Sequence, residues 1–141
     1  MKLRYLSLAI LIITLACQTT REEERISSTL RTFYTYYITA ISEYHDSHEM
    51  ESFLDSLKHV YCSPSLLTRI QNEFARGELG YDPFIYAQDA NIDCLKTLTI
   101  KKDTIIPYYN VSYIDQYSGA MIKIKLKVVK QNDSIKVIDI W

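Results

Sequence analysis

The chain has 141 residues and a formal net charge of −1, and 48% of its residues are hydrophobic. With only three Gly and three Pro it is not a low-complexity or disordered chain, and the near-neutral charge gives no basis for a nucleic-acid partner. The length suits one domain with a single core.

The first residues carry the pattern of a secretory signal. Residues 1–4 include two basic side chains, residues 5–16 are almost uninterruptedly apolar, and the sequence turns polar after Cys17. The apolar run is shorter than the roughly 20 residues that span a bilayer. Loss of Lys2 and Arg4 with a cleaved leader changes the formal charge from −1 to −3.

The residues around Cys17 resemble the lipobox of bacterial lipoproteins. Leu15, Ala16 and Cys17 fit it, whereas Thr14 stands where Leu is preferred. The resemblance implies that residues 1–16 are a lipoprotein signal peptide. It also implies that a diacylated Cys17 holds the mature chain on a membrane without a protein span. A conventional secreted protein that is cut nearby is the alternative.

Residues 17–25 are predicted to form a tether that runs into a helix. The charged run Arg21-Glu22-Glu23-Glu24-Arg25 loosely resembles the export signal that sends some lipoproteins to the outer leaflet. A charged first helical turn explains the same residues. We therefore expect a lipid-anchored protein of the bacterial cell envelope, at the outer membrane, on its periplasmic or surface face.

Three amphipathic helices are predicted after the tether. The first covers about residues 22–45, because apolar residues recur at steps of three and four. Its apolar stripe consists of Ile26, Leu30, Phe33, Tyr37, Ile41 and Tyr44. The second covers about Met50–Tyr61. Ser63 and Pro64 then form a helix-start signal, and the third helix runs to about Arg76.

About four antiparallel strands are predicted after Cys94, because β-branched and aromatic residues alternate there with polar ones. The predicted ranges are Leu95–Lys101, Ile105–Asp115, Ala120–Gln131 and Ser134–Trp141. In the third strand one face is apolar and the other carries lysines. Helices followed by a run of strands are typical of an α+β fold.

The order of elements and the segment Glu78–Asp89 resemble a known fold and family. Three helices followed by an antiparallel meander look like the NTF2-like (cystatin-like) fold, in which a curved sheet wraps the long first helix and leaves a conical pocket. Tyr81-Asp82-Pro83-Phe84 followed by Ala87-Gln88-Asp89 resembles small secreted bacterial lipoproteins of the DUF3828 type, whose function is unknown. The resemblance covers residues 26–141 and implies no chemistry and no cofactor.

Five residues between the helices and the strands are the candidate ligand-binding residues. They are Tyr81, Asp82, Tyr86, Gln88 and Asp89. At the mouth of a conical pocket they would grip a ligand, or one carboxylate with a raised pKa would act as a base. In the alternative, Asp82 caps a turn before Pro83, and Gln88 and Asp89 satisfy backbone donors of the loop.

Cys62 and Cys94 are expected to form a disulfide, because an exported chain folds in an oxidising compartment. Two buried free thiols, packed as small apolar side chains, are the alternative.

Two other clusters have weaker functional interpretations. His45 and His48 look like metal ligands, but they straddle a helix end and the sequence fixes no third ligand, so no metal is predicted. Lys123, Lys125 and Lys127 offer a basic sheet face to an acidic partner, or they solubilise the strand and block edge pairing.

No Ser-His-Asp, phosphate-binding Gly loop or CxxC motif is present. We therefore expect a non-catalytic binding module of the cell envelope, of which an immunity-type inhibitor of a toxin is one version. The alternative is a small-pocket NTF2-like enzyme, an isomerase or dehydratase with a buried carboxylate near a Tyr. The expected partners are the membrane through acylated Cys17, a protein ligand, and a second copy of the chain through the sheet. Val137, Ile138, Ile140 and Trp141 would allow that sheet contact.

Overall fold

The computed structural model describes the backbone of residues 2–141 and the side chains of residues 20–141. The elements are α1 (Lys2–Glu43), α2 (Ser47–Tyr61), α3 (Pro64–Ala75), the short 3-10 helix η1 (Ile92–Lys96), β1 (Thr99–Lys102), β2 (Tyr108–Ile114), β3 (Met121–Gln131) and β4 (Ser134–Ile140). The predicted lipidation at Cys17 lies outside the described side chains. Within the described residues, no helix has the length and apolarity that a membrane crossing requires.

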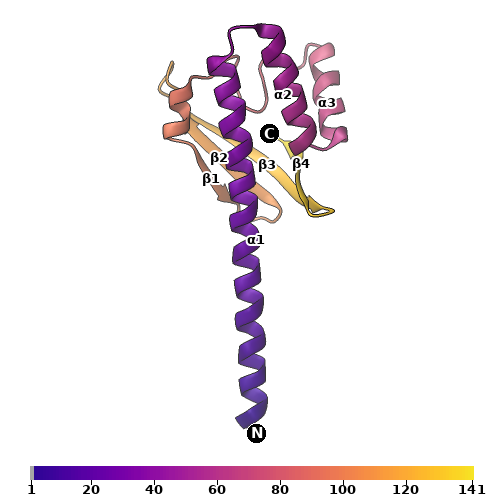
Figure 1. The fold of residues 1–141 in the computed structure, drawn as a ribbon, viewed down its shortest axis with the longest axis vertical. Coiled ribbons are helices and arrows are strands. Elements are labelled where there is room, and N and C mark those ends of the chain that lie inside the picture. The colour runs from indigo at the N-terminus through magenta and orange to yellow at the C-terminus, as the bar shows by residue number, and fades with distance from the viewer. Residues whose placement is uncertain (1) are drawn as a thin grey trace.

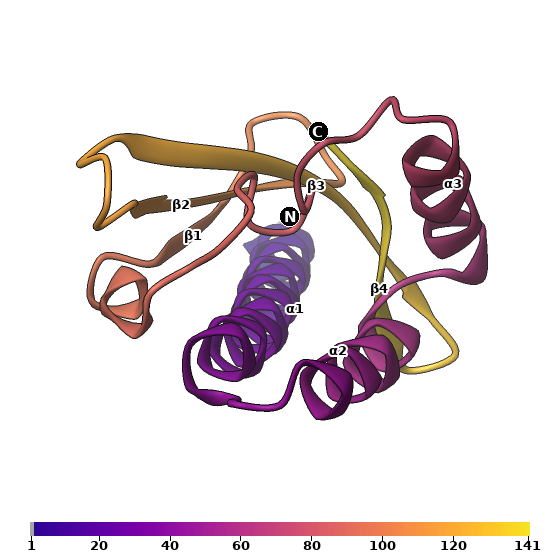
Figure 2. The ribbon, with the colours of Figure 1, turned by 90° about the horizontal axis from the view of Figure 1, so that it is seen from above.

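The four strands form one antiparallel meander in the order β1-β2-β3-β4. Figure 1 shows α1 crossing the sheet and extending far beyond it, and Figure 2 shows α1 and α2 on one face, with α3 beside β4. Three helices on a curved four-stranded sheet confirm the predicted α+β, NTF2-like arrangement.

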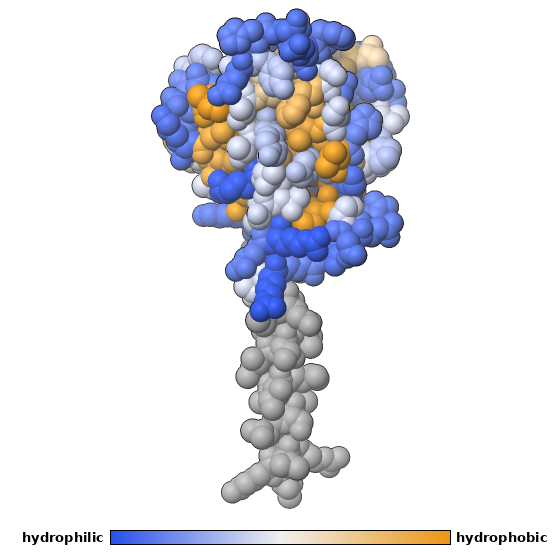
Figure 3. Space-filling view, viewed as in Figure 1, coloured by the Kyte–Doolittle hydropathy of each residue, from blue (hydrophilic) through white to orange (hydrophobic). Residues whose placement is uncertain are grey.

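The core lies between α1 and the inner face of the sheet. Alternation in β3 buries Ile124, Leu126 and Val128 and turns the intervening lysines outward, as predicted. Phe33, Tyr34, Tyr37 and Ile38 bring large side chains from α1 into the same space. On the face shown in Figure 3, apolar residues border α1 on both sides, and hydrophilic residues gather at the two ends of the domain.

The residues predicted as a tether belong to α1, which is helical from Lys2 onward. Glu23 forms an ion pair with Lys102, and the Arg25 guanidinium donates to the carbonyl of Asp133. These contacts join the helix to the ends of β1 and of the β3–β4 hairpin. Residues 22–25, predicted both as the end of the tether and as the start of the first helix, are therefore helical and bonded to the domain.

The first two strands are shorter than predicted, because side chains cap turns on either side of them. Asn91 accepts the Asp93 amide (2.9 Å) and starts η1, so residues up to Lys96 are not extended. Asp103 accepts the Ile105 amide (3.1 Å), and the chain turns until β2 begins at Tyr108.

The predicted disulfide is absent, and Cys62 and Cys94 are both buried free thiols. Cys62 pairs with Val137 on β4, whereas Cys94 lies in η1, which packs on α1 and β2. Two strand spacings of about 4.8 Å separate β2 from β4, and a disulfide requires Cα atoms within about 7 Å. The alternative of buried thiols is what the structure shows.

Candidate functional site

Asp82 points toward α1 and is fully engaged there. The Tyr37 hydroxyl donates to Asp82 Oδ2 (2.6 Å), and the Phe84 amide donates to Asp82 Oδ1 (2.8 Å). Burial raises the pKa of Asp82, although both hydrogen bonds favour the ionised form. The carboxylate thus caps the turn at residues 82–84 and connects that turn to α1. This is the turn-capping role that the sequence analysis gave as the alternative for Asp82.

Further bonds tie the loop that follows Asp82 to the elements on both sides of it. The Ser42 hydroxyl of α1 donates to the Ala90 carbonyl (2.9 Å), and the Tyr113 hydroxyl of β2 donates to the Ile85 carbonyl. The sequence pattern did not single out Tyr37, Ser42 or Tyr113 as partners. The available signal was that a tyrosine on a buried stripe needs a partner for its hydroxyl.

Aromatic side chains fill the space where an NTF2-like fold would keep a conical pocket. The Phe84 ring lies 5.5 Å from the rings of both Phe33 and Tyr37, and those two rings are 5.2 Å apart. Phe33, Tyr37, Phe84 and Ile85 are buried. We call residues 82–90 the plug, because Phe84 and Ile85 fill this space between α1 and β2.

The remaining predicted site residues lie on the outer side of the plug or beside it. The rings of Tyr81 and Tyr86 meet edge to face at 4.7 Å, with Tyr86 half exposed. Gln88 Nε2 donates to the Gly80 carbonyl (3.3 Å), and Asp89 Oδ1 accepts the Ala90 amide (2.8 Å). The structure therefore brings Tyr81 and Tyr86 together and uses the polar side chains within the loop.

Tyr34 differs from the polar side chains described above, which all form hydrogen bonds. Its hydroxyl is buried and has no hydrogen-bond partner among the described residues, within the core that also holds Tyr37 and Tyr113. Burial raises the pKa of Tyr34 well above its ordinary value, with smaller contributions from Tyr113, Cys62 and Asp82. A neutral, unpaired hydroxyl in this position has a desolvation cost of about 1–3 kcal/mol.

His45 lies in the α1–α2 turn and His48 in the first turn of α2. The His45 ring bonds to the Glu43 carbonyl (2.9 Å), and the backbone amide of His48 donates to Asp46, the N-cap of α2. Over the described residues, no group of three His, Cys, Asp or Glu side chains could hold a metal ion.

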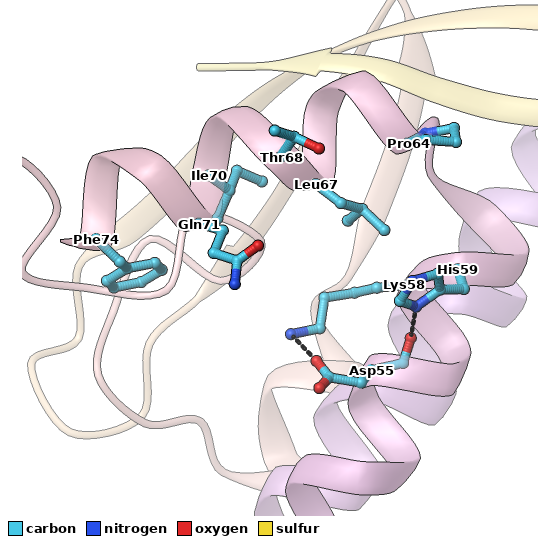
Figure 4. A pocket seen from close by; sticks show the side chains of 9 residues that line it. All are labelled: Asp55, Lys58, His59, Pro64, Leu67, Thr68, Ile70, Gln71 and Phe74. Carbon is cyan, nitrogen blue, oxygen red and sulfur yellow. Dashed lines mark hydrogen bonds and ion pairs between the residues drawn. The ribbon is translucent and has the colours of Figure 1, made fainter.

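A groove of about 490 Å³ runs between α2 and α3. Figure 4 shows Leu67 and Phe74 on its α3 wall, facing the charged residues of α2. Lys58 pairs with Asp55 there (3.0 Å), and the His59 ring bonds to the Asp55 carbonyl (2.7 Å). This groove is open at the surface and, unlike the interior, is not filled by the chain.

The outer sheet face combines lysines with aromatic rings. Lys125 lies 4.8 Å from the centre of the Tyr108 ring and pairs with Asp103 (3.0 Å), and the Trp141 ring is 5.6 Å from that of Tyr108. Val137 and Ile140 face the core, so they are not available for the sheet contact that their sequence suggested. Ile138 and Trp141 remain accessible.

No family profile and no curated protein matches the chain. Among solved structures, it is similar to the crystal structure, at 2.10 Å resolution, of a protein of unknown function from Bacteroides thetaiotaomicron VPI-5482. The TM-score is 0.82 and the identity 21%, over 92% of this chain and 98% of that one. At this identity the likeness shows the fold alone.

Proposed function

We propose that the protein is a lipid-anchored binding module of the bacterial cell envelope, without catalytic activity, and that it belongs with the DUF3828-type lipoproteins. The observation that supports this most is the filled interior. Phe33, Tyr37 and Phe84 occupy the place of the conical pocket, so a partner has only the surface to bind.

The groove between α2 and α3 is the surface we propose for a protein partner. It offers the apolar side chains Leu67 and Phe74 beside the polar rim of Asp55, Lys58 and His59. Apolar centres with polar rims are typical of protein interfaces. An immunity-type inhibitor of a toxin is one form that such a module takes.

The membrane anchor is tested by lipid labelling in cells. Cys17→Ser should abolish incorporation of labelled palmitate and leave the unprocessed precursor, whereas Thr14→Leu, which completes the lipobox pattern, should preserve processing. Equal labelling of the wild type and Cys17→Ser would contradict the anchor.

The binding surface is tested by capture of partners from envelope extracts. Phe74→Asp should abolish capture of any partner that the wild type recovers, whereas Tyr117→Asp, at an exposed turn away from α2 and α3, should leave it unchanged. A partner that binds both variants equally would place the binding surface elsewhere.

A small-pocket enzyme of the isomerase or dehydratase type is the second candidate. The partly buried Asp82 carboxylate with its raised pKa, beside Tyr37, is the observation in its favour. Both carboxylate oxygens already accept hydrogen bonds, and the ring of Tyr37, which donates one of them, packs 5.5 Å from the ring of Phe84. A small molecule retained in the purified protein, seen by native mass spectrometry and lost in Asp82→Asn, would favour this function instead.

A further inference from the structure

The β1–β2 hairpin ends in an exposed apolar pair. Ile105 and Ile106 have 57% and 71% of their surface exposed, although hairpin tips ordinarily carry Gly, Asn, Asp, Ser or Pro. We call residues 103–107 the hairpin tip. Two adjacent isoleucines in water at such a tip indicate a contact that the isolated domain does not provide.

The hairpin tip lies at the end of the domain from which α1 leaves toward the N-terminus (Figure 1). Lys102, just before the tip, pairs with Glu23 of α1. Ile106 and Pro107 line a groove of about 370 Å³ together with Glu22, Glu23 and Ile26 of α1. The tip and the start of the mature chain are therefore neighbours.

The predicted lipid attachment is a short distance along the chain from this contact. Cys17 precedes Glu23 by six residues, which span about 9 Å as a helix and about 20 Å fully extended. A bilayer that holds the acyl chains of Cys17 would then lie at this end of the domain, facing the two isoleucines.

The charges at this end nearly cancel, so apolar contact rather than electrostatic attraction is the expected driving force. Basic and acidic side chains alternate at this end in nearly equal number. They include Arg21, Arg25, Lys102, Lys125 and Lys130, and Glu22, Glu23, Glu24, Asp103 and Asp133. Binding through this end should depend little on anionic lipid or on salt.

We propose that Ile105 and Ile106 insert into the interfacial region of the bilayer that anchors Cys17. This inference rests on the lipid anchor of the proposed function. A diacyl chain and an apolar tip then make two attachment points, which fix the orientation of the domain on the membrane. The plug and the β2–β3 turn face away from the bilayer in that orientation.

The test uses the mature protein, purified from bacterial membranes and reconstituted into phosphatidylcholine vesicles doped with nitroxide-labelled lipid. An environment-sensitive fluorophore is attached to Ile106→Cys, or to Tyr117→Cys as the matched control, because these two exposed residues have nearly equal exposure at opposite ends of the domain (71% and 70%). Cys62 and Cys94 are buried and remain unlabelled. Ile105→Cys repeats the measurement at the neighbouring tip position.

We expect quenching at position 106 to be several-fold stronger than at position 117, with a blue-shifted emission, and to persist in high salt. Nitroxides near the headgroups should quench more than nitroxides near the chain ends. Vesicle flotation separates the two possible failures. Protein that floats without quenching at positions 105 and 106 overturns the insertion alone, whereas protein that does not float overturns the lipid anchor and the insertion with it.

Discussion

Two loops of this chain contain the same local hydrogen bond but lead to opposite environments. The Phe84 amide donates to Asp82 Oδ1 (2.8 Å), and the Ile105 amide donates to Asp103 Oδ1 (3.1 Å). Phe84 then enters the core, whereas Ile105 is 57% exposed. The turn chemistry is shared, so the surrounding structure decides whether the apolar residue after the turn is buried.

The electrostatic environments of the two aspartates differ in the same way. Burial raises the pKa of Asp82, which faces the tyrosine-rich core. The Lys125 ammonium and the Ile105 amide hold the pKa of Asp103 well below its usual range. Buried Phe84 and Ile85 make the plug part of the folded core, whereas Ile105 and Ile106 leave the apolar part of the hairpin tip exposed.

The largest expected effect is that of emptying the plug. Phe84→Ala should lower the free energy of unfolding by about 3–5 kcal/mol, because it removes a buried ring that two aromatic neighbours contact. Ile106→Ala, at the hairpin tip, should change it by less than about 0.5 kcal/mol. Denaturant unfolding measures the free energy of unfolding of both variants. Similar losses of stability in the two variants would contradict the claim that the plug is core and the hairpin tip is surface.

The hydrogen bond that ties the plug to α1 should have the next largest effect. Tyr37→Phe should destabilise by about 1.5–3 kcal/mol, because it removes a hydrogen bond donated to the partly buried Asp82 carboxylate. Tyr34→Phe, one helical turn away, removes a hydroxyl that has no partner and should be neutral or stabilising. A larger loss for Tyr34→Phe than for Tyr37→Phe would show that the hydrogen bonds are assigned incorrectly.

The two aspartates should give pH dependences of opposite sign. The folded state raises the pKa of Asp82, so the wild type should gain stability relative to Asp82→Asn as the pH falls from neutral through that raised pKa. The pKa of Asp103 is lowered, so its stabilisation is present above the unfolded pKa of about 3.9 and is lost as the pH falls further. Denaturant unfolding of the wild type, Asp82→Asn and Asp103→Asn between neutral and acidic pH measures both changes in stability. A change of the same sign for both aspartates would contradict the difference between their environments.

The smallest expected effect concerns the two buried thiols, which should not react at all in the folded protein. Cys62 and Cys94 are both buried, and burial raises the pKa of Cys62 to about 12. Because a reagent cannot reach either thiol, neither should be alkylated in the folded protein. Unfolding without reductant should expose both to alkylation, as seen by intact mass. An added Ile106→Cys should react at once. A requirement for reductant before Cys62 and Cys94 react would mean that they are oxidised.

Local signals predicted most of the fold. Ser63-Pro64 set the start of α3, and the alternation in β3 placed its lysines and apolar residues on the correct faces. The errors came where a side chain caps a turn inside an apolar run, as Asn91 and Asp103 do. Alternation alone does not reveal such caps, because the same residues are also compatible with strand ends.

The site was harder to predict, because its partners are distant in sequence. Asp82 was singled out, and the turn-capping alternative describes its bond to the Phe84 amide. Tyr37 lies 45 residues earlier, and periodicity identified it only as part of an apolar stripe. The separation of Cys62 from Cys94 depends on which strand each one contacts, which neither composition nor compartment determines.

Native-state hydrogen exchange at the Phe84 and Ile105 amides tests the central claim most directly, because both donate to an aspartate two residues earlier. A plug that belongs to the folded core predicts that Phe84 exchanges only through global unfolding, while Ile105 exchanges through local opening, orders of magnitude faster. Equally fast exchange at both amides would mean that the plug opens in the native state, and the interior would then be accessible to a ligand.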